Sequence, residues 1–467
     1  MVTDTIWPPD FTKSAGPKYL VLIQSLRTAV RSGALERGYK MPTVRDLAWE
    51  LGITPGTVAR AYRMAADEGL VETTVGRGTF VAGAAPVQGG VSPGDPLITE
   101  VATDSIDLRA CRVLDVGQEA AIRAGLSRLS DSPGFSYRDY PNSQTTAPAQ
   151  TAVARWIGPD RAGRFETGDV VMGLGAQHSV IMALQTCLHG ATPVILTETL
   201  CYPGVRHAAR LLRAQVVGVE MDEYGLRPDR LEEALQRHGG QVLLTAPEAH
   251  SPTAVHTPVE RRQEIARIAQ RYQLRIIEDD CHCITRPDAP TYRAICPDHA
   301  WYISSLTKSV SSALRFGFAV CPRGQGAAAQ QVAQSSFYGM PQPILDLGAD
   351  LIDSGQAEEM RAGVVQAVQA RVRMAVNILG QWDISWQPSL PFIWLRLPQG
   401  WRGSTFMRAC DAAGVQIKSA DEFALPDGQS PHSVRVSLTP DVSEAVLQGA
   451  LERLSGLLAR PPVNVDL

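Results

Sequence analysis

The sequence predicts two folded domains: a winged helix-turn-helix, helical with a β-hairpin wing, and a larger α/β domain around a mostly parallel sheet. Three observations support this prediction. The chain has 467 residues, more than one ordinary domain contains. Residues 1–82 show three helical segments and a hairpin, and residues 105–467 alternate short apolar strands with helices. Between them, residues 83–104 are rich in Gly, Pro and Ala, which is typical of a flexible connector.

The composition is that of a globular protein, with 44% hydrophobic and 20% charged residues and no apolar run long enough for a membrane span. Residues 1–10 carry two acids and no base, unlike a signal peptide, so we expect a cytoplasmic protein. Eight scattered cysteines argue against a disulfide scaffold. The run Cys281-His282-Cys283 has no second ligand pair at zinc spacing, so no metal site is expected.

The net charge of −4 is unevenly distributed along the chain. Residues 1–82 sum to +2 and the remainder sums to −6. Residues 1–82 are called the head below, and residues 105–467 the body. A mildly basic head on an acidic body permits DNA binding without being diagnostic of it. The evidence for DNA therefore has to come from the pattern of the head itself.

The first helical segment of the head is Lys18–Ser32. It places Leu20, Ile23, Leu26 and Val30 at helical spacing, which predicts one apolar face. A helix of this length packs against its neighbours through such a face. The glycine that follows the segment ends the pattern.

Two shorter helices are predicted next. The first, Val44–Leu51, begins after Thr43, whose spacing to Asp46 resembles a capping box. The second begins at Pro55 and has Thr54 as its N-cap. Proline is tolerated at the first helical position because the N–H that it lacks would have no partner within the helix.

A hairpin completes the head, because Leu70–Thr74 and Gly78–Val81 read as two short strands around a glycine-containing turn. A helix pair followed by a hairpin is a winged helix-turn-helix, whose second helix enters the major groove of DNA. The alternative is a structural three-helix module with solvated charges. The candidate DNA contacts lie on the exposed starts of the helices or on the wing: Thr43, Arg45, Thr54, Thr57, Arg60, Tyr62, Arg77 and Gly78.

Four stretches of the head resemble the GntR family of DNA-binding domains: Met41–Thr54, Thr57–Tyr62, Asp67–Leu70 and Gly76–Val81, in the same order and spacing. The resemblance extends over nearly the whole head. Relatives carry a polar or basic pair where this chain has Pro55 and the glycine after it. This departure removes one potential DNA contact and leaves the operator sequence open.

The large domain alternates strands with helices. Seven apolar stretches have the length of strands buried in a sheet: Val170–Leu174, Pro193–Leu196, Gln215–Val219, Gln241–Thr245, Arg275–Glu278, Ala300–Ser304 and Gly317–Cys321. Helical segments lie between them, for example Gln177–Cys187, Pro203–Leu212, Pro228–Gln236 and Pro258–Tyr272. This alternation predicts a largely parallel sheet with helices on both faces and ligands at the carboxyl ends of the strands.

Three motifs fall at those strand ends. Gly173–Gln177 opens a helix, where small residues and helix amides suit an anion, although a glycine turn alone is weak evidence. Ser304–Lys308 and Arg315 bring hydroxyls, an amine and a guanidinium together; a lysine entering an apolar core can act as a Schiff-base nucleophile, and the alternative is a solvated basic loop. Ile276–Asp280 ends in carboxylates that need a cationic or protonated partner if buried.

Together these motifs resemble the fold-type-I pyridoxal-phosphate enzymes over roughly residues 105–460. The resemblance implies a mostly parallel central sheet with a small C-terminal α+β subdomain. It also implies that Lys308 forms the internal aldimine with pyridoxal 5'-phosphate and that Asp279 pairs with the pyridine nitrogen. Tyr202 matches the aromatic residue that stacks on the ring, and Arg435 matches the arginine that binds an effector carboxylate. By the same resemblance the cofactor phosphate is bound by Ser305, Thr307, Arg315 and the amides of Gly175, Ala176 and Gln177.

The departures from that family concern proton transfer. Relatives place a tyrosine two or three residues after the pyridine-binding aspartate, where this chain has Cys281 and His282; His282 could bond the cofactor's phenolic oxygen instead. Ser251 stands where relatives have Asn and Ala254 where they have Gly, and the adjacent His250 could compensate. An enzyme that times proton transfers tolerates such changes poorly, whereas a sensor that needs only the cofactor linkage tolerates them well.

A GntR-type head on an aminotransferase-like body resembles the MocR subfamily of regulators. The resemblance implies a homodimer whose heads bind double-stranded operator DNA and whose body exchanges the internal aldimine with an amino acid or related primary-amine effector. We therefore expect a pyridoxal-phosphate-dependent transcription regulator that does not work as an enzyme. Two alternatives remain open: an active aminotransferase with an accessory DNA-binding domain, and a regulator whose body has lost the cofactor.

Overall fold

The computed structural model divides into two compact units, and each is described by itself. The structure describes all residues except 1–6, 10, 12–16, 32–33, 37, 68–69, 75–77, 82–104, 132–136, 286, 426–429 and 463–467. The predicted linker at 83–104 therefore lies outside the described residues. Among the described helices, none combines the length and the apolar character that a membrane span needs.

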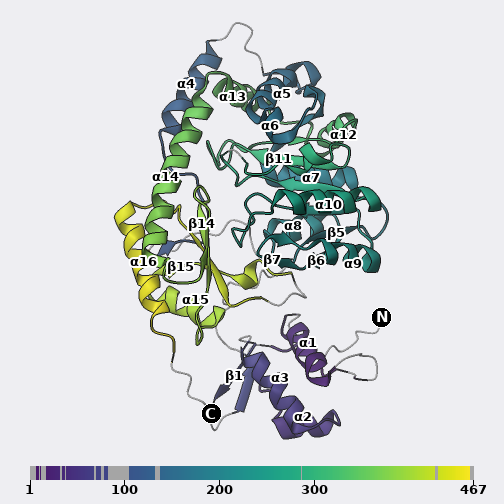
Figure 1. The fold of residues 1–467 in the computed structure, drawn as a ribbon, viewed down its shortest axis with the longest axis vertical. Coiled ribbons are helices and arrows are strands. Elements are labelled where there is room, and N and C mark those ends of the chain that lie inside the picture. Colours follow the sequence, from purple (N-terminus) through teal and green to yellow (C-terminus); the bar gives the residue numbers. More distant parts are fainter. Residues whose placement is uncertain are drawn as a thin grey trace. The chain divides into compact units, whose positions relative to one another are not determined.

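The first unit contains three helices and a hairpin, labelled in Figure 1: α1 (Lys18–Arg31), α2 (Val44–Glu50), α3 (Pro55–Asp67), β1 (Val71–Thr74) and β2 (Gly78–Val81). The two strands pair antiparallel. The caps of the helices are those that the sequence predicts. The N-cap before α2 accepts a hydrogen bond from the backbone of the third helical residue, and α3 begins at the proline. These elements confirm the winged helix-turn-helix.

The apolar face of α1 differs from the predicted one. Leu22 is fully buried beside Ile23 and Leu26, whereas Leu20 is 38% exposed. At about 100° per residue, Leu20 lies roughly 60° outside the arc that the buried side chains span. Spacing alone identified a plausible face, and packing against α3 selected a neighbouring one.

The second unit is built on a seven-stranded sheet in the order β4-β12-β11-β10-β9-β5-β6, in which only β12 runs antiparallel to its neighbours. The strands in chain order are β4 (Val170–Leu174), β5 (Val194–Glu198), β6 (Gln215–Val219), β9 (Val242–Thr245), β10 (Arg275–Asp279), β11 (Ala300–Ser305) and β12 (Phe316–Val320). Each lies within two residues of its prediction. Except for the edge strand β6, the strands are mostly buried, and strands buried on both faces are continuous apolar runs.

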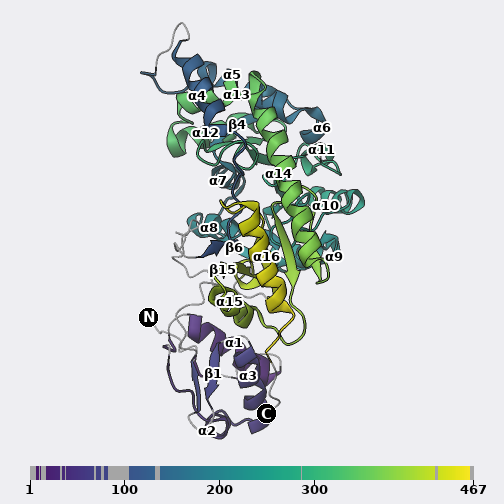
Figure 2. The same ribbon diagram turned by 90° about the vertical axis from the view of Figure 1, so that its left-hand side faces the viewer.

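Helices cover both faces of this sheet (Figures 1 and 2). Consecutive residues of β10 show the division, since Ile277 packs in the cluster with α7 and α8 whereas Ile276 packs with α9 and α10. The helices around the sheet are α5 (Ser143–Ile157), α7 (Ala176–Cys187), α8 (Gly204–Leu211), α9 (Pro228–His238), α10 (Val259–Tyr272), α12 (Gly326–Phe337) and α13 (Gln342–Asp353). Shorter elements complete it: α6 (Pro159–Ala162), η2 (Thr167–Asp169), β7 (Met221–Asp222), β8 (Gly225–Leu226) and α11 (Tyr292–Ile295).

The remaining C-terminal part of this unit forms a four-stranded sheet in the order β13-β14-β17-β16. It contains β13 (Ile384–Ser385), β14 (Phe392–Arg396), β16 (Lys418–Ser419), β17 (Ser433–Ser437) and the helix α16 (Glu444–Leu458). The helix α15 (Gly403–Ala412) follows β14 in the chain, and its residues Ser404–Arg408 belong to the first unit. The 24-residue helix α14 (Gln356–Leu379) contacts both α13 and α16, as Figure 1 shows, and so joins this part to the large sheet. Further elements are β3 (Ile106–Asp107), α4 (Gln118–Ser130), β15 (Val415–Gln416) and η3 (Ala420–Glu422).

Two buried acids occupy the end of β10. The Oε2 atom of Glu278 accepts a hydrogen bond from the backbone N–H of Tyr292 at 2.6 Å, and burial raises the pKa of Glu278 to about 8. Asp280 accepts a hydrogen bond from the Tyr302 hydroxyl at 2.9 Å and pairs with Nε of Arg161 at 3.2 Å. Asp280 thus has the cationic partner that the sequence predicts for a buried carboxylate, whereas the raised pKa of Glu278 favours its neutral form at neutral pH.

Glu278→Gln is expected to stabilise the protein in a pH-dependent way. The folded-state pKa lies above the ordinary 4.5, so the stability that the proton confers is complete below pH 4.5 and is lost as the pH rises through about 8. Glutamine keeps an acceptor for the Tyr292 amide and carries no charge to desolvate. Denaturant unfolding should show a gain of roughly 2–5 kcal/mol above pH 8 and little gain near pH 5. The exposed Glu119→Gln is the matched control, and an equal gain at both pH values would contradict the explanation.

Candidate functional site

The turn between β4 and α7 is the first part of the site. Gly175 caps α7 with φ +80°, and a Cβ there would lie 2.5 Å from Nη2 of Arg315. That Nη2 donates a hydrogen bond to the carbonyl oxygen of Leu174 at 3.0 Å. The guanidinium therefore lies directly against the glycine turn, and the backbone amides of Ala176 and Gln177 begin the helix beside it. Cation and helix N-terminus together suit a phosphate.

The end of β11 adds hydroxyl groups. The backbone N–H of Thr307 donates to Oγ of Ser305 at 3.3 Å. The Oγ1 atom of Thr307 is buried and has no hydrogen-bond partner among the described residues. A buried hydroxyl without a partner costs about 1–3 kcal/mol, which a bound acceptor would relieve. These observations fit the phosphate of the expected cofactor.

Lys308 follows directly and is half-buried. Its Nζ donates a hydrogen bond to the carbonyl oxygen of Cys111 at 2.6 Å. Burial raises the pKa values of the Asp279 and Cys281 side chains, and the charge of Lys308 opposes this effect on both, so the three groups lie close together. Beyond residue 82 the sequence contains only one other lysine, Lys418. Only these two residues of the large unit can therefore supply a Schiff-base amine.

Asp279 ends β10 and is half-buried at the same place. Its Oδ1 accepts a hydrogen bond from the backbone N–H of Cys281 at 3.2 Å. Burial raises the pKa of Asp279, although the hydrogen bonds from Cys281 and the charge of Lys308 oppose this effect. A cationic hydrogen-bond donor would stabilise the carboxylate further, and a protonated pyridine nitrogen is such a donor.

Tyr202 lies just before α8 and is 39% exposed, so its ring borders the open side of the site. Burial of its hydroxyl, with the nearby Cys281 and Asp279, raises its pKa to about 12 and keeps the phenol neutral. A Cβ on Gly204 would lie 2.2 Å from the ring, so glycine is required there. Nε2 of Gln177 donates to the Gly204 carbonyl oxygen at 2.9 Å and ties this turn to the start of α7.

His282 lies three residues after Asp279, and the lowering of its pKa favours the neutral imidazole. Burial and the charges of Lys308 and Arg435 hold its pKa well below the ordinary value. Its ring meets that of Phe392 edge-on with centroids 5.4 Å apart, and its Nδ1 is buried without a hydrogen-bond partner among the described residues. A neutral imidazole ring has one N–H that it can donate. The hydrogen bond from His282 to the cofactor's phenolic oxygen stays a prediction.

Arg435 reaches the site from β17 and is 6% exposed. Its Nη1 donates to Oγ of Ser251 at 3.0 Å and its Nη2 to the carbonyl oxygen of Arg109 at 2.7 Å. Its Nε is buried and has no hydrogen-bond partner among the described residues. The guanidinium also lies 4.8 Å from the ring centroid of Phe423. The structure thus brings Ser251 and Arg435 together, as an anion-binding pair would require.

Sequence reasoning missed several residues that border this site. The carbonyl oxygens of Cys111 and Arg109 contribute through the backbone, for which side-chain motifs carry no signal. Glu422 and Lys418 form an ion pair at 2.8 Å near Arg435. Their four-residue spacing was visible in the sequence, but their place in the site depends on strand pairing.

Of the residues predicted to contact DNA in the first unit, two threonines cap helices and Arg45 is exposed to solvent. Thr43 and Thr54 each accept a backbone N–H in the first turn of a helix, from Asp46 at 3.2 Å and from Thr57 at 3.3 Å. Their hydroxyls therefore fix the starts of α2 and α3. Arg45 is exposed on α2.

Other predicted contacts are placed differently. The guanidinium of Arg60 lies 3.9 Å from the ring centroid of Tyr19. Gly78 is exposed at the start of β2 with φ +110°. Tyr62 is a correction: it is 5% exposed within the core of the unit, and its hydroxyl donates to the Pro42 carbonyl oxygen at 2.9 Å, so it cannot reach DNA from this position. Arg77 lies outside the described residues.

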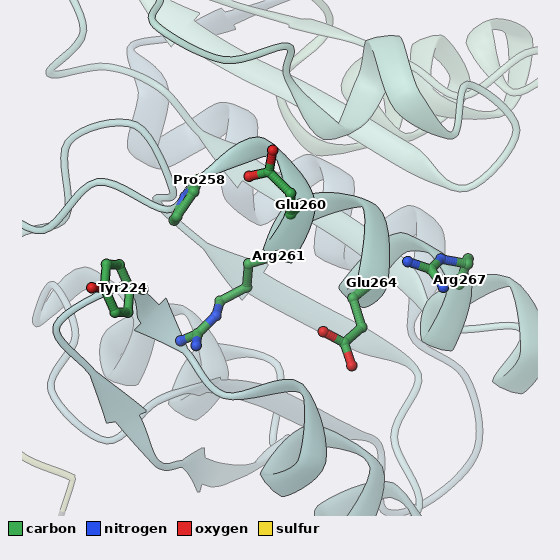
Figure 3. A pocket seen from close by; sticks show the side chains of 6 residues that line it. All are labelled: Tyr224, Pro258, Glu260, Arg261, Glu264 and Arg267. Carbon is green, nitrogen blue, oxygen red and sulfur yellow. The ribbon is translucent and has the colours of Figure 1, made fainter.

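A surface pocket on α10 is separate from this site. Figure 3 shows the side chains that line it: Tyr224, Pro258, Glu260, Arg261, Glu264 and Arg267. Arg261 already pairs with Asp222, and its guanidinium lies 5.5 Å from the Tyr224 ring centroid. Of its two arginines, Arg261 is paired with Asp222 and Arg267 donates to the Gln263 carbonyl oxygen at 3.3 Å, so this pocket of mixed charges offers no reactive group.

One group of described residues has metal-ligand character. The ligand atoms of Glu248, His256 and Asp288 lie within 4.8 Å of one another. The Glu248 carboxylate, however, already accepts hydrogen bonds from Arg262 at 2.6 Å and from the Asp288 backbone N–H at 2.7 Å. These bonds explain its burial without a metal ion.

Comparison with known proteins supports both units. The family "Aminotransferase class I and II" matches residues 112–454, and "Bacterial regulatory proteins, gntR family" matches residues 18–81. An uncharacterized HTH-type transcriptional regulator of Bacillus subtilis, YdeF, is 25% identical over 95% of both chains. The vitamin B6 salvage pathway transcriptional repressor PtsJ of Salmonella typhimurium is 23% identical over 90% of this chain and 93% of its own. Kynurenine aminotransferase of Pyrococcus horikoshii shares the fold, with a TM-score of 0.69, 18% identity and coverage of 76% and 91%.

Proposed function

We propose, from the premise that this chain belongs to the aminotransferase class I and II family, that it is a pyridoxal-phosphate-dependent transcription regulator that senses a primary amine. The observation that carries the proposal is the union of two parts in one chain. A winged helix-turn-helix of the gntR family precedes a body that retains a lysine, an aspartate and an anion-binding turn at the strand ends. The relatives that match both parts bear the names of transcription regulators.

Pyridoxal phosphate is the cofactor of this fold, and the side chains around Lys308 suit it. We assign its phosphate to Ser305, Thr307, Arg315 and the amides of Gly175, Ala176 and Gln177. Asp279 would hold the pyridine nitrogen, Tyr202 would cover the ring, and His282 and Ser251 would border its phenolic oxygen. The bound cofactor supplies an aldehyde carbon that condenses with primary amines.

Arg435 indicates what else the effector carries. A buried guanidinium whose Nε has no partner among the described residues, and whose two further N–H groups donate to neutral oxygens, is suited to a carboxylate or sulfonate. The effector class is therefore an amino acid or amino sulfonate. Its amine would reach Lys308 while its anion is bound by Arg435.

The body is better suited to sensing than to turnover. Catalytic transamination moves protons repeatedly near the reacting carbon, and the residues that follow Asp280 are a half-buried thiol and a half-buried imidazole. Cys281 has a pKa well above its ordinary value and His282 one well below, so neither exchanges protons readily near neutral pH. We infer that the domain is not used as an enzyme.

Assembly and location follow from the proposed role. Regulators that read paired half-sites are symmetric dimers, so we propose a homodimer in the cytoplasm, where the chromosome lies. The stacked and exposed rings of Tyr140 and Tyr338, 5.2 Å apart, supply aromatic surface of the kind enriched at interfaces. We place the DNA-binding domain at residues 1–82, the linker at 83–104 and the effector and dimerisation domain at 105–467.

A turnover assay separates a sensor from an aminotransferase. The cofactor-loaded protein is mixed with an amino acid panel and an excess of 2-oxoglutarate, and the new amino acid is quantified over hours. The proposal expects a change in cofactor absorbance that is complete at one equivalent per subunit and no product beyond that amount. Sustained product formation would support the alternative, an active aminotransferase with an accessory DNA-binding domain.

Arg45→Ala is expected to weaken DNA binding by a similar factor whatever the base sequence of the DNA. An exposed arginine on α2 is placed to neutralise one phosphate, so its loss should reduce the slope of log K against log salt by about one. Fluorescence anisotropy with the upstream intergenic DNA at several salt concentrations measures this slope. Arg123→Ala, an exposed arginine of α4 in the other unit, is the matched control. An unchanged slope in Arg45→Ala would remove this residue from the interface.

A further inference from the structure

His178 occupies the first turn of α7, three residues after Gly175, which caps the helix. Its ring is half-buried, and its Nδ1 atom accepts a hydrogen bond from the backbone N–H of Leu174 at 3.1 Å. The ring also meets that of Phe337 edge-on, with centroids 4.4 Å apart. Two contacts from different elements therefore fix the orientation of this imidazole beside the turn that would receive the cofactor phosphate.

The hydrogen bond from Leu174 sets the protonation state of the ring. A backbone N–H can only donate, so Nδ1 of His178 carries no proton, and the one proton of the neutral ring is on Nε2. Burial and the charge of Arg315 lower the pKa of His178, in agreement with a neutral ring. His178 is therefore a hydrogen-bond acceptor that brings no charge.

Leu174 connects His178 to Arg315. The Leu174 N–H bonds the imidazole, and the Leu174 carbonyl oxygen accepts a hydrogen bond from Nη2 of Arg315 at 3.0 Å. Arg315 needs such support because its backbone has φ +50°, a left-handed conformation that is unfavourable for a residue with a Cβ atom. Loss of the imidazole would remove a bond that holds the Leu174 backbone, and would so loosen the guanidinium bound to that backbone.

The type of residue at position 178 points to the phosphate as well as to the helix. Side chains at the third helical position that accept a backbone N–H at the helix start are usually Glu or Gln, and an acid there also interacts favourably with the helix dipole. A carboxylate at this position would lie near the guanidinium of Arg315, whose charge already acts on His178. An imidazole accepts the same bond and leaves that cation available to an anion.

We propose that His178 is a positioning residue of the phosphate subsite. Its neutral ring fixes the Leu174 backbone, this backbone holds Arg315, and the Arg315 charge stays available to the phosphate. The inference rests on the proposed function and deepens it, since it assigns a further residue to the cofactor site.

The test compares pyridoxal 5'-phosphate with pyridoxal, which lacks the phosphate. Cofactor-free full-length protein is titrated with each, and the absorption band of the bound form gives the Kd. We expect His178→Ala to raise the Kd of pyridoxal phosphate by about fivefold or more, and that of pyridoxal by less than about twofold. Equal weakening of both ligands, or an unchanged Kd for pyridoxal phosphate, would overturn the role.

Two variants of equal shape separate the phosphate from the capping of α7. His178→Asn places an uncharged oxygen near the position of Nδ1 and should restore the wild-type Kd for pyridoxal phosphate. His178→Asp adds a negative charge, so it should keep the stability to denaturant while its Kd for pyridoxal phosphate exceeds that of His178→Ala. The exposed His238→Ala is the matched control and should change neither Kd. No recovery in His178→Asn, or wild-type affinity in His178→Asp, contradicts the proposal.

A double variant tests the path through Arg315. In an Arg315→Ala background, His178→Ala should raise the Kd of pyridoxal phosphate by less than about twofold, because the two residues act on the phosphate together. An effect as large as in the wild-type background would show that they act independently and would overturn the positioning role. A wild type that develops no band with pyridoxal phosphate would overturn the proposed function, and the role of His178 fails with it.

Discussion

Lys308→Ala is expected to abolish the visible absorption band that the cofactor acquires when it is bound covalently. Lys308 is half-buried beside Asp279, and Lys418, the only other lysine beyond residue 82, is paired with Glu422. Replacement of Lys308 therefore leaves the pocket without an amine to condense with the cofactor aldehyde. Borohydride reduction followed by peptide mass spectrometry should locate the cofactor on Lys308 in the wild type and find none in the variant.

Two controls make this result specific. Lys308→Arg keeps a positive charge near the Cys111 carbonyl oxygen and should lose the band all the same, because a guanidinium does not form the linkage. Lys418→Ala should keep the band. A band that survives in Lys308→Ala, with the reduced cofactor found elsewhere, would refute the assignment of the site. A wild type that binds no cofactor would support the remaining alternative, a body kept only as a scaffold.

Arg435→Gln is expected to lower the affinity for the effector by about 100-fold or more, while the absorption band of the bound cofactor is retained. The substitution removes a charge and at least two N–H donors from the anion, and each charge-assisted hydrogen bond contributes about 1.5–3 kcal/mol. The fit between guanidinium and carboxylate is bidentate, so Arg435→Lys should recover only part of the loss. The Kd from the absorbance titration measures the change. Equal affinity in Arg435→Gln would place the anion elsewhere.

Much of the fold was accessible from the sequence, for physical reasons. The predicted strand Val170–Leu174 coincides with β4, and Gln241–Thr245 differs from β9 by one residue, because a strand covered on both faces consists almost entirely of apolar residues. The helix starts at Thr43 and Pro55 were accessible because caps are local chemistry. These features need only the residues within one turn of the chain.

Tertiary contacts caused the errors. Tyr62 lies on the predicted recognition helix, and its sequence position cannot distinguish a side chain that faces DNA from one that bonds the Pro42 carbonyl oxygen. Leu20 and Leu22 are both leucines on one helix, and only the position of α3 decides which is buried. Sequence periodicity identifies an apolar face to within about one residue step around the helix.

The site shows the same division between local and distant information. Gly175, Asp279 and Lys308 each end or follow a strand, so their meeting at one edge of the sheet was predictable from the alternation of strands and helices. Glu422 was not, because its place depends on the pairing of Lys418 with Arg435 across two strands 17 residues apart in the chain. No motif marks such a residue.

The most direct test of the account is a gel shift on the upstream intergenic DNA with wild-type protein and Lys308→Ala, each with and without a panel of amines. The account predicts that both proteins bind the DNA, that one or more amines change the wild-type affinity, and that no amine changes the affinity of Lys308→Ala. An amine response of equal size in Lys308→Ala would contradict sensing through the cofactor. Absence of any specific DNA binding by the wild type would contradict the role as a regulator.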